Sequence, residues 1–146
     1  MGARTAGRQA ALQMLFGIEV ASTDVPVAIR AFWREFEGDP DGREYADAAV
    51  RGVGDQLAKI DELLRTASTN WRIERMARVD RNLMRIATWE ILTQLEVPRA
   101  VIIDEAVELA KRFGTEESAA FVNGVLDRVA EVCGRIDLDR DTHEQS

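Results

Sequence analysis

Apolar residues recur every three or four positions along almost the whole chain of 146 residues, and this spacing constrains the fold more than any other feature. Between Arg75 and Leu95, for example, the apolar positions cluster within about one third of a helical circumference. No long stretch alternates between apolar and polar residues as a half-buried strand does. The sequence therefore predicts an all-α protein.

Glycine and proline divide this pattern into segments, because both residues interrupt helices. The clearest turn is predicted at residues 38–42, Pro26 and Pro98 stand where helices begin, and Gly114 stands where one ends. Gly52 and Gly54 are expected to loosen or divide the long third segment. We expect a compact bundle of six or seven helices, with helical segments at about 4–21, 26–36, 43–67, 75–95, 98–113 and 115–133.

The length of the chain suits one domain, or two small subdomains that share a core. No apolar run approaches the roughly 20 residues that span a bilayer, so we expect no membrane partner. The first residues lack the apolar core of a secretion signal, which predicts a cytoplasmic protein. Residues 137–146 are polar and acidic, and we expect them to form a flexible tail.

Residues that build catalytic or metal centres are scarce. The chain has one cysteine, Cys133, and one histidine, His143, and it contains none of the common nucleotide-binding, zinc-protease or serine-hydrolase motifs. Cys133 falls on the apolar face of the last segment, which favours a structural thiol. The acidic residues Asp104, Glu105 and Glu108 are expected to form a solvated face. We therefore predict a protein that is not an enzyme, with no metal or cofactor.

The net charge of −7 conceals an uneven distribution of charge. Residues 35–62 carry nine acids and three basic residues, whereas residues 65–85 carry six arginines and two acids. Because a polyanion responds to the local field of one face, the basic stretch keeps a nucleic-acid partner open. Most of the basic residues are arginines, which bind phosphate and stack on bases, although a bias in codon usage explains the same preference.

Three stretches of the chain resemble the NusB family of bacterial transcription antitermination factors. The first is RQAALQMLF at residues 8–16, and the second is DRNLMRIATWEIL at residues 80–92. The third and most specific begins with Val97-Pro98, continues with IDEAVELAKRFG at 103–114 and closes with FVNGVLD at 121–127. The resemblance covers nearly the whole chain and is weakest between residues 21 and 43 and in the tail.

The resemblance implies one domain over residues 1–136, built of two helical subdomains at about 1–70 and 71–136. It also implies that the protein binds the boxA element of ribosomal RNA leader transcripts together with the ribosomal protein NusE. In that family the pair joins an RNA polymerase antitermination complex.

The resemblance also assigns RNA-binding residues to three places in this chain. Arg4 and Arg8 match an arginine-rich opening segment, of which this chain keeps only these two arginines. Arg8 precedes the first apolar stripe, so its side chain is expected to be exposed. Arg81 and Arg85 share one side of a predicted helix with Arg78, as a surface row. At the start of the last helix the matching residues are Glu117, Ala120, Phe121 and Asn123.

Three further residues match positions that bind the ribosomal protein in the family: Phe16, Glu74 and Asp80. Phe16 is expected to lie half in the core and half at the interface. Glu74 and Asp80 would face a basic partner, and charge complementarity would steer the encounter. The alternative interpretation of Glu74 is local charge balance with Arg78, one helical turn away.

Two alternative functions remain open from the sequence. The same helical domain resembles the N-terminal extension of certain ribosomal RNA cytosine methyltransferases, although we expect no nucleotide-binding α/β domain within these 146 residues. Some members of the family self-associate, so a homodimer with a hidden RNA face is the second alternative. Size measurements with and without RNA distinguish this dimer from the RNA-binding form.

Overall fold

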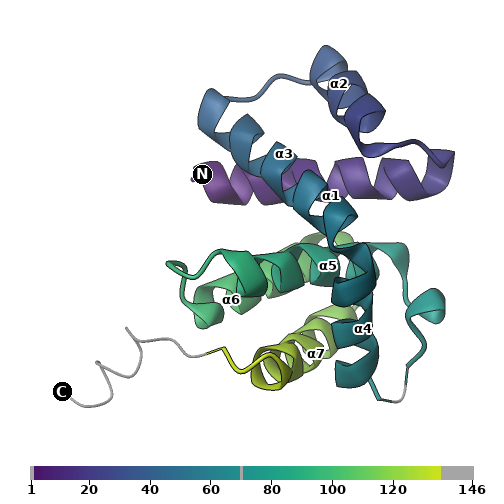
Figure 1. The fold of residues 1–146 in the computed structure, drawn as a ribbon, viewed down its shortest axis with the longest axis vertical. Coiled ribbons are helices and arrows are strands. Elements are labelled where there is room, and N and C mark those ends of the chain that lie inside the picture. Colours follow the sequence, from purple (N-terminus) through teal and green to yellow (C-terminus); the bar gives the residue numbers. More distant parts are fainter. Residues whose placement is uncertain (1, 70, 136–146) are drawn as a thin grey trace.

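The computed structural model of the protein describes residues 2–69 and 71–135, which form seven α-helices and one 3-10 helix and contain no strand (Figure 1). The predicted all-α class is therefore confirmed. No helix in the described ranges has the length and apolar character that crossing a membrane requires. The helices are α1 (Ala3–Ala21), α2 (Val25–Glu35), α3 (Pro40–Asp55), α4 (Leu57–Ala67), η1 (Ile73–Arg75), α5 (Arg78–Thr93), α6 (Arg99–Phe113) and α7 (Ser118–Val132).

Side-chain caps fix the starts of α2 and α3. The carboxylate of Asp24 accepts a hydrogen bond from the backbone N–H of Val27, and Asp39 does the same for Gly42. A proline lies in the first turn of each helix, where its missing N–H costs nothing. The turn predicted at 38–42 is therefore shorter than expected, because Pro40 already belongs to α3.

The helical stretch predicted at 43–67 is divided, as its glycines indicated: the chain breaks at Gln56 into α3 and α4. Gly52 lies just before this break and lets α3 approach the indole of Trp89 on α5. A Cβ atom at Gly52 would lie 1.9 Å from Nε1 of Trp89, so no larger residue fits without movement. Two other predicted starts move along the chain, to Arg78 for α5 and to Ser118 for α7.

Helices α1, α2 and α3 form one group, and α4 to α7 form a second group in the other half of the molecule (Figure 1). Helix α5 of the second group also packs against α1 and α3 of the first group. Helix α4, which the proposed boundary near residue 70 would place in the first subdomain, packs against α5 and α7. The residues of the predicted tail, with His143, lie outside the described residues.

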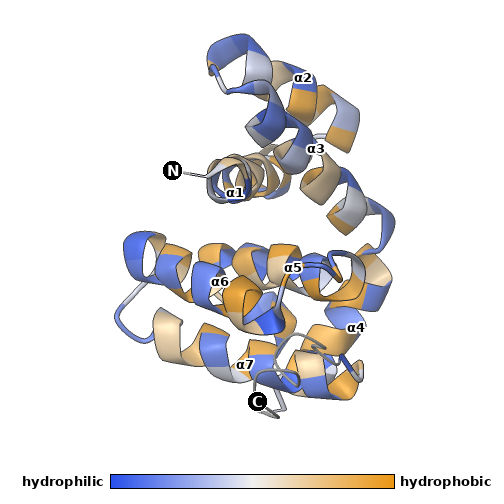
Figure 2. Ribbon diagram, turned by 90° about the vertical axis from the view of Figure 1, so that its left-hand side faces the viewer, coloured by the Kyte–Doolittle hydropathy of each residue, from blue (hydrophilic) through white to orange (hydrophobic). Residues whose placement is uncertain are grey.

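The core is continuous between the two groups. Apolar and polar residues alternate along the helices, as expected of amphipathic helices that bury one side (Figure 2). The largest fully buried apolar side chains are Ile60, Leu64, Leu83, Met84, Ile91, Ile102 and Leu126. Cys133 is half-buried at the edge of this core, and its thiol donates to the carbonyl of Ala130.

Candidate nucleic-acid and partner interface

Arg8 is buried in the contact between α1 and α5, and the prediction that it is exposed is wrong. Only 2% of its surface is accessible, and the carboxylate of Glu90 that it meets is 1% accessible. Its Nε lies 3.0 Å from both carboxylate oxygens, and one terminal nitrogen lies 2.7 Å from Oε2. This is a two-pronged ion pair inside the core, so the guanidinium does not face solvent.

Two further side chains complete the cluster around Arg8. The hydroxyl of Tyr45 donates to Glu90 over 2.6 Å, and Glu105 of α6 lies 3.8 Å from the guanidinium. Burial would lower the pKa of Arg8, but the hydrogen bonds and the charge of Glu90 outweigh it and raise that pKa. Burial and the same carboxylate raise the pKa of Tyr45 far above its usual range. The cluster therefore stays ionised at Arg8 and neutral at Tyr45 at ordinary pH.

Arg4 behaves differently from Arg8, although both lie in the first turns of α1. Its side chain is half-exposed and lies 3.3 Å from the carboxylate of Glu96, which is also exposed. Such a pair in solvent is weak, so the guanidinium can exchange Glu96 for another anion. Arg4 also lines a cavity of about 620 Å³ that Tyr45, Trp89 and Glu105 border.

Arg81 and Arg85 do not form the solvated surface row that the sequence predicts. Both converge on Glu19 near the end of α1, and their side chains are only 12% and 13% accessible. Arg81 lies 2.6 Å from Glu19 and also donates to the carbonyls of Ile73 and Met76. Arg85 donates to Glu19 and makes a second, two-pronged pair with Asp61 of α4. These residues, with Arg78 at 3.4 Å from Glu19, form the Glu19 cluster.

The Glu19 cluster joins three helices that are distant in the sequence. Partial burial would raise the pKa of Glu19, but hydrogen bonds and charge from Arg81 and Arg85 hold it below its usual range. The carboxylate therefore stays ionised and fixes the end of α1 against α5. Arg81 and Arg85 consequently act first as structural cations, and phosphate would have to compete with Glu19 and Asp61 for them.

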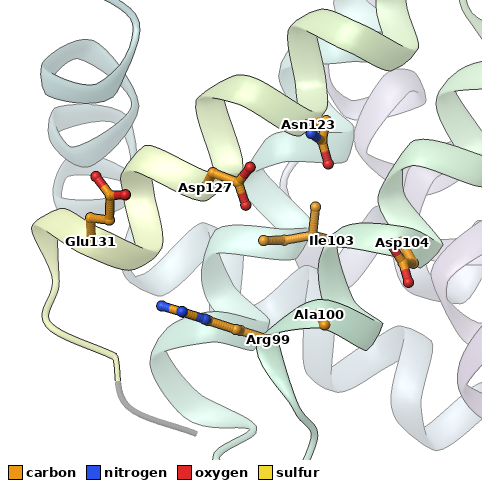
Figure 3. A pocket seen from close by; sticks show the side chains of 7 residues that line it. All are labelled: Arg99, Ala100, Ile103, Asp104, Asn123, Asp127 and Glu131. Atoms are coloured by element: carbon orange, nitrogen blue, oxygen red, sulfur yellow. The ribbon is translucent and has the colours of Figure 1, made fainter. Parts of the chain in front are cut away.

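The residues matched at the start of α7 lie at the surface. Glu117, Ala120 and Asn123 are exposed, and Phe121 is half-buried. Asn123 borders a cavity of about 230 Å³ between α6 and α7, where Asp104, Asp127 and Glu131 also lie (Figure 3). Because these carboxylates make the cavity negative apart from Arg99, Asn123 suits contact with a base edge better than contact with a phosphate.

Phe121 is covered on one side by Trp71, which belongs to the link between α4 and η1. Their ring centroids are 5.9 Å apart and the planes meet at 71°, an edge-to-face contact. Trp71 was not among the predicted site residues. An exposed tryptophan in a polar link is a signal that the sequence offers, but only the fold shows that it lies beside Phe121.

The three residues assigned to the protein partner lie near the end of α1 and the start of α5. Phe16 is 41% exposed. Glu74 pairs with Arg65 at 3.6 Å and not with Arg78, which corrects the alternative interpretation. A backbone hydrogen bond, followed by the charge of Arg65, lowers the pKa of Glu74. Asp80 is buried, and its Oδ1 finds no hydrogen-bond partner among the described residues.

The predicted RNA-binding residues form two groups at opposite ends of α5. Arg4 and Arg8 meet Glu96 and Glu90 near its C-terminal end, where Arg135 also ties the end of α7 to the carbonyl of Ile91. Phe121 lies at the other end of α7, and α5 is about 24 Å long at 1.5 Å per residue. The residues assigned to RNA are therefore not one continuous patch.

A model of the NusB family matches residues 5–131 of the chain. The chain belongs to the NusB family. Transcription antitermination protein NusB of Sorangium cellulosum is 64% identical over 140 residues, which cover 96% of this chain and 100% of the relative. The NusB of Myxococcus xanthus is 46% identical over 134 residues, covering 89% of this chain and 96% of the relative. The family resemblance read from the three stretches is thus confirmed.

Solved NusB structures have the same fold. T. maritima NusB matches with a TM-score of 0.80 and 37% identity, covering 88% of this chain and 90% of that chain. A crystal structure of the antitermination factors NusB and NusE in complex with dsRNA matches with a TM-score of 0.79, covering 90% and 98%. Its identity is 24%, so this second likeness shows the NusB fold alone.

Proposed function

We propose that this chain is a transcription antitermination factor without enzymatic activity, which binds boxA-type RNA together with the ribosomal protein NusE. It would act within an RNA polymerase antitermination complex in the cytoplasm. The observation that carries the proposal is the 64% identity to an antitermination protein over that relative's full length. The solved complex of related factors with NusE and dsRNA gives it support.

The geometry divides the residues assigned to RNA by their accessibility. We assign direct contacts to the residues whose side chains are accessible: Arg4, Glu117, Ala120, Phe121 and Asn123. Phe121 is half-buried, and the other four are exposed or half-exposed. Arg8, Arg81 and Arg85 are already held by carboxylates of the chain. We therefore assign these three a positioning role, in which they hold α1 and α5 in the arrangement that presents the contacting residues.

Phe16, Glu74 and Asp80 are proposed to contact NusE. All three lie near the end of α1 or the start of α5, the two helices that the Glu19 cluster joins; Phe16 and Glu74 are exposed, and Asp80 is buried. A fixed ion cluster beneath a contact surface keeps its side chains in place before the partner arrives, which lowers the entropic cost of binding.

The proposal is tested by titrating fluorescent boxA-type RNA with the protein alone and with saturating NusE. We expect weak binding by the isolated protein, because three of the arginines assigned to RNA are already held by carboxylates of the chain, and tighter binding when NusE is present. An RNA of the same composition in scrambled order is the control for sequence preference. Equal affinity for both RNAs, or no effect of NusE, would contradict the proposal. Light scattering on the same samples reports whether the chain self-associates.

A further inference from the structure

Trp71 exposes a large aromatic surface at a position that the fold does not require to be apolar. Its surface is 59% accessible, whereas Trp89 is buried in the core. Its only aromatic neighbour among the described residues is Phe121, which it meets edge to face. An indole held in this way by one ring keeps most of its area in contact with water, an unfavourable arrangement unless something else covers it.

We propose that Trp71 and Phe121 together form a stacking site for one unpaired RNA base. This inference rests on the proposed function and adds Trp71 to its contact residues. Two rings at 71° give a base one flat surface on which to stack and a second ring against which its edge rests. Unpaired bases are commonly recognised by stacking on aromatic side chains, and every base has a face that suits such a platform.

Positive charge flanks the pair on both sides. Arg72 follows Trp71 directly in the chain and is exposed. Arg128 lies two turns after Phe121 on the same side of α7, about 10 Å along the helix. Its guanidinium lies near the carbonyl of Ala67 and the hydroxyl of Thr69, so it reaches the link that carries Trp71. Cations at these two places suit the phosphates on either side of a stacked base.

The surroundings favour RNA over an apolar protein segment. The carboxylate of Glu117 lies one turn before Phe121 and is exposed, where it can accept a hydrogen bond from the amino group of a base.

The exposed ring of Phe36 offers a contrast within the same chain. It stacks on Phe32 at 4.7 Å, but its neighbours in the chain are Glu35 and Glu37, which repel phosphate. Phe36 is therefore a matched control, an exposed and paired aromatic ring in acidic surroundings.

The experiment compares Trp71→Ala, Trp71→Phe and Phe36→Ala in titrations of boxA-type RNA with saturating NusE. Because base stacking on an aromatic ring is strong, Trp71→Ala should weaken RNA binding by at least about fivefold. Trp71→Phe should retain most of the affinity, and Phe36→Ala should bind as the unchanged protein does. Thermal unfolding of each variant shows whether the fold is intact. NusE binding without RNA should be the same in all of them.

Two further measurements separate stacking from a structural role of Trp71. RNA should quench tryptophan fluorescence of the unchanged protein, and this quenching should be largely lost in Trp71→Phe. Single abasic substitutions along the RNA should identify one position at which removing the base and Trp71→Ala are not additive. A merely structural role would give additive effects at every position and no loss of quenching.

The outcomes distinguish this inference from the proposed function. If the unchanged protein does not bind boxA-type RNA with NusE, the proposed function fails. If it binds and Trp71→Ala binds equally well, only the stacking site is refuted. If Trp71→Ala weakens NusE binding in the absence of RNA, the exposed indole covers a protein contact and the inference is overturned.

Discussion

Replacing Arg8 by alanine should destabilise the fold, although the family resemblance assigns this residue to RNA. The substitution leaves the carboxylate of Glu90 in a site where it is 1% accessible and still accepts a hydrogen bond from the Tyr45 hydroxyl. Three short nitrogen–oxygen contacts disappear, at 2.7 to 3.0 Å. Removing one partner of such a buried pair typically costs about 3–5 kcal/mol, because the other charge stays buried without compensation.

The assay is urea unfolding followed by circular dichroism, with thermal unfolding beside it. For a chain of this size, a loss of about 3–5 kcal/mol corresponds to a fall in Tm of about 10 °C or more. The matched control is Arg4→Ala, which removes a half-exposed pair with Glu96 one turn earlier in the same helix. That variant should lose less than about 1 kcal/mol.

A second variant tests the cause of the loss. Arg8→Met combined with Glu90→Leu removes both charges and keeps comparable volume, so it should recover much of the stability that Arg8→Ala loses. The reasoning is refuted if Arg8→Ala unfolds within about 1 kcal/mol of the unchanged protein, because Arg8 would then not be paired in the core. It is also refuted if the double variant is no more stable than Arg8→Ala.

Three other substitutions test particular contacts. Glu19→Gln should lower the free energy of unfolding by about 1–3 kcal/mol at pH 7, because it weakens charged hydrogen bonds to Arg81 and Arg85. Folding lowers the pKa of Glu19, so the stability from its ionised form is present above the unfolded pKa of about 4.3 and is lost as pH falls through the folded pKa. Urea unfolding near pH 3 should therefore give a smaller difference between Glu19→Gln and the unchanged protein. Gly52→Ala should lower the free energy of unfolding by about 1–3 kcal/mol or more, because the added Cβ collides with Trp89. Gly17→Ala should raise it by about 0.5–1 kcal/mol, because nothing lies within 4 Å of the added Cβ. Thermal unfolding of both variants checks these two expectations. Asp80→Asn should change the free energy of unfolding by less than about 1 kcal/mol, because the carboxylate stabilises the fold mainly through the dipole of α5, in whose first turn it lies. The same variant should bind NusE more weakly in calorimetry. Unchanged NusE affinity would show that Asp80 is not part of the interface.

The helices could be predicted from the sequence because their apolar residues repeat at helical spacing. The exact position of the break, at Gln56, could not be located, because Gly52 and Gly54 mark an interruption without fixing the residue at which α3 ends. Gly52 was visible as an interruption, but its packing partner was not. Local patterns indicate where helices form, whereas the residues that pack against a helix come from distant parts of the chain.

The positions of the arginines were predicted less well, and the reason lies in the same periodicity. Arg8 stands four residues before Leu12 and seven before Leu15, so it lies on the apolar stripe of α1. Glu90 likewise continues the stripe of Leu83 and Ile86 on α5. Opposite charges on two buried stripes are the signal of an internal ion pair. The sequence shows each charge, but only the fold shows that the two meet.

The six arginines of residues 65–85 do not act as one basic surface, because acids from other helices neutralise part of them. Glu19 and Asp61 hold Arg81 and Arg85, and Glu62 and Glu74 lie beside Arg65.

Among the contacts assigned above, the accessible cations are Arg4, Arg72 and Arg128. With about 0.7 counterions released per contact to a single strand, the isolated protein should show a salt slope of about −2 for boxA-type RNA. If Arg8 and the arginines of residues 65–85 all contacted phosphate together with Arg4, eight contacts would give a slope of about −5 to −6. Titrations between about 50 and 200 mM salt resolve this difference, and the steeper slope would mean that RNA opens the Arg8 and Glu19 clusters and takes their arginines. The shallow slope would place most of the affinity in stacking and in the protein partner.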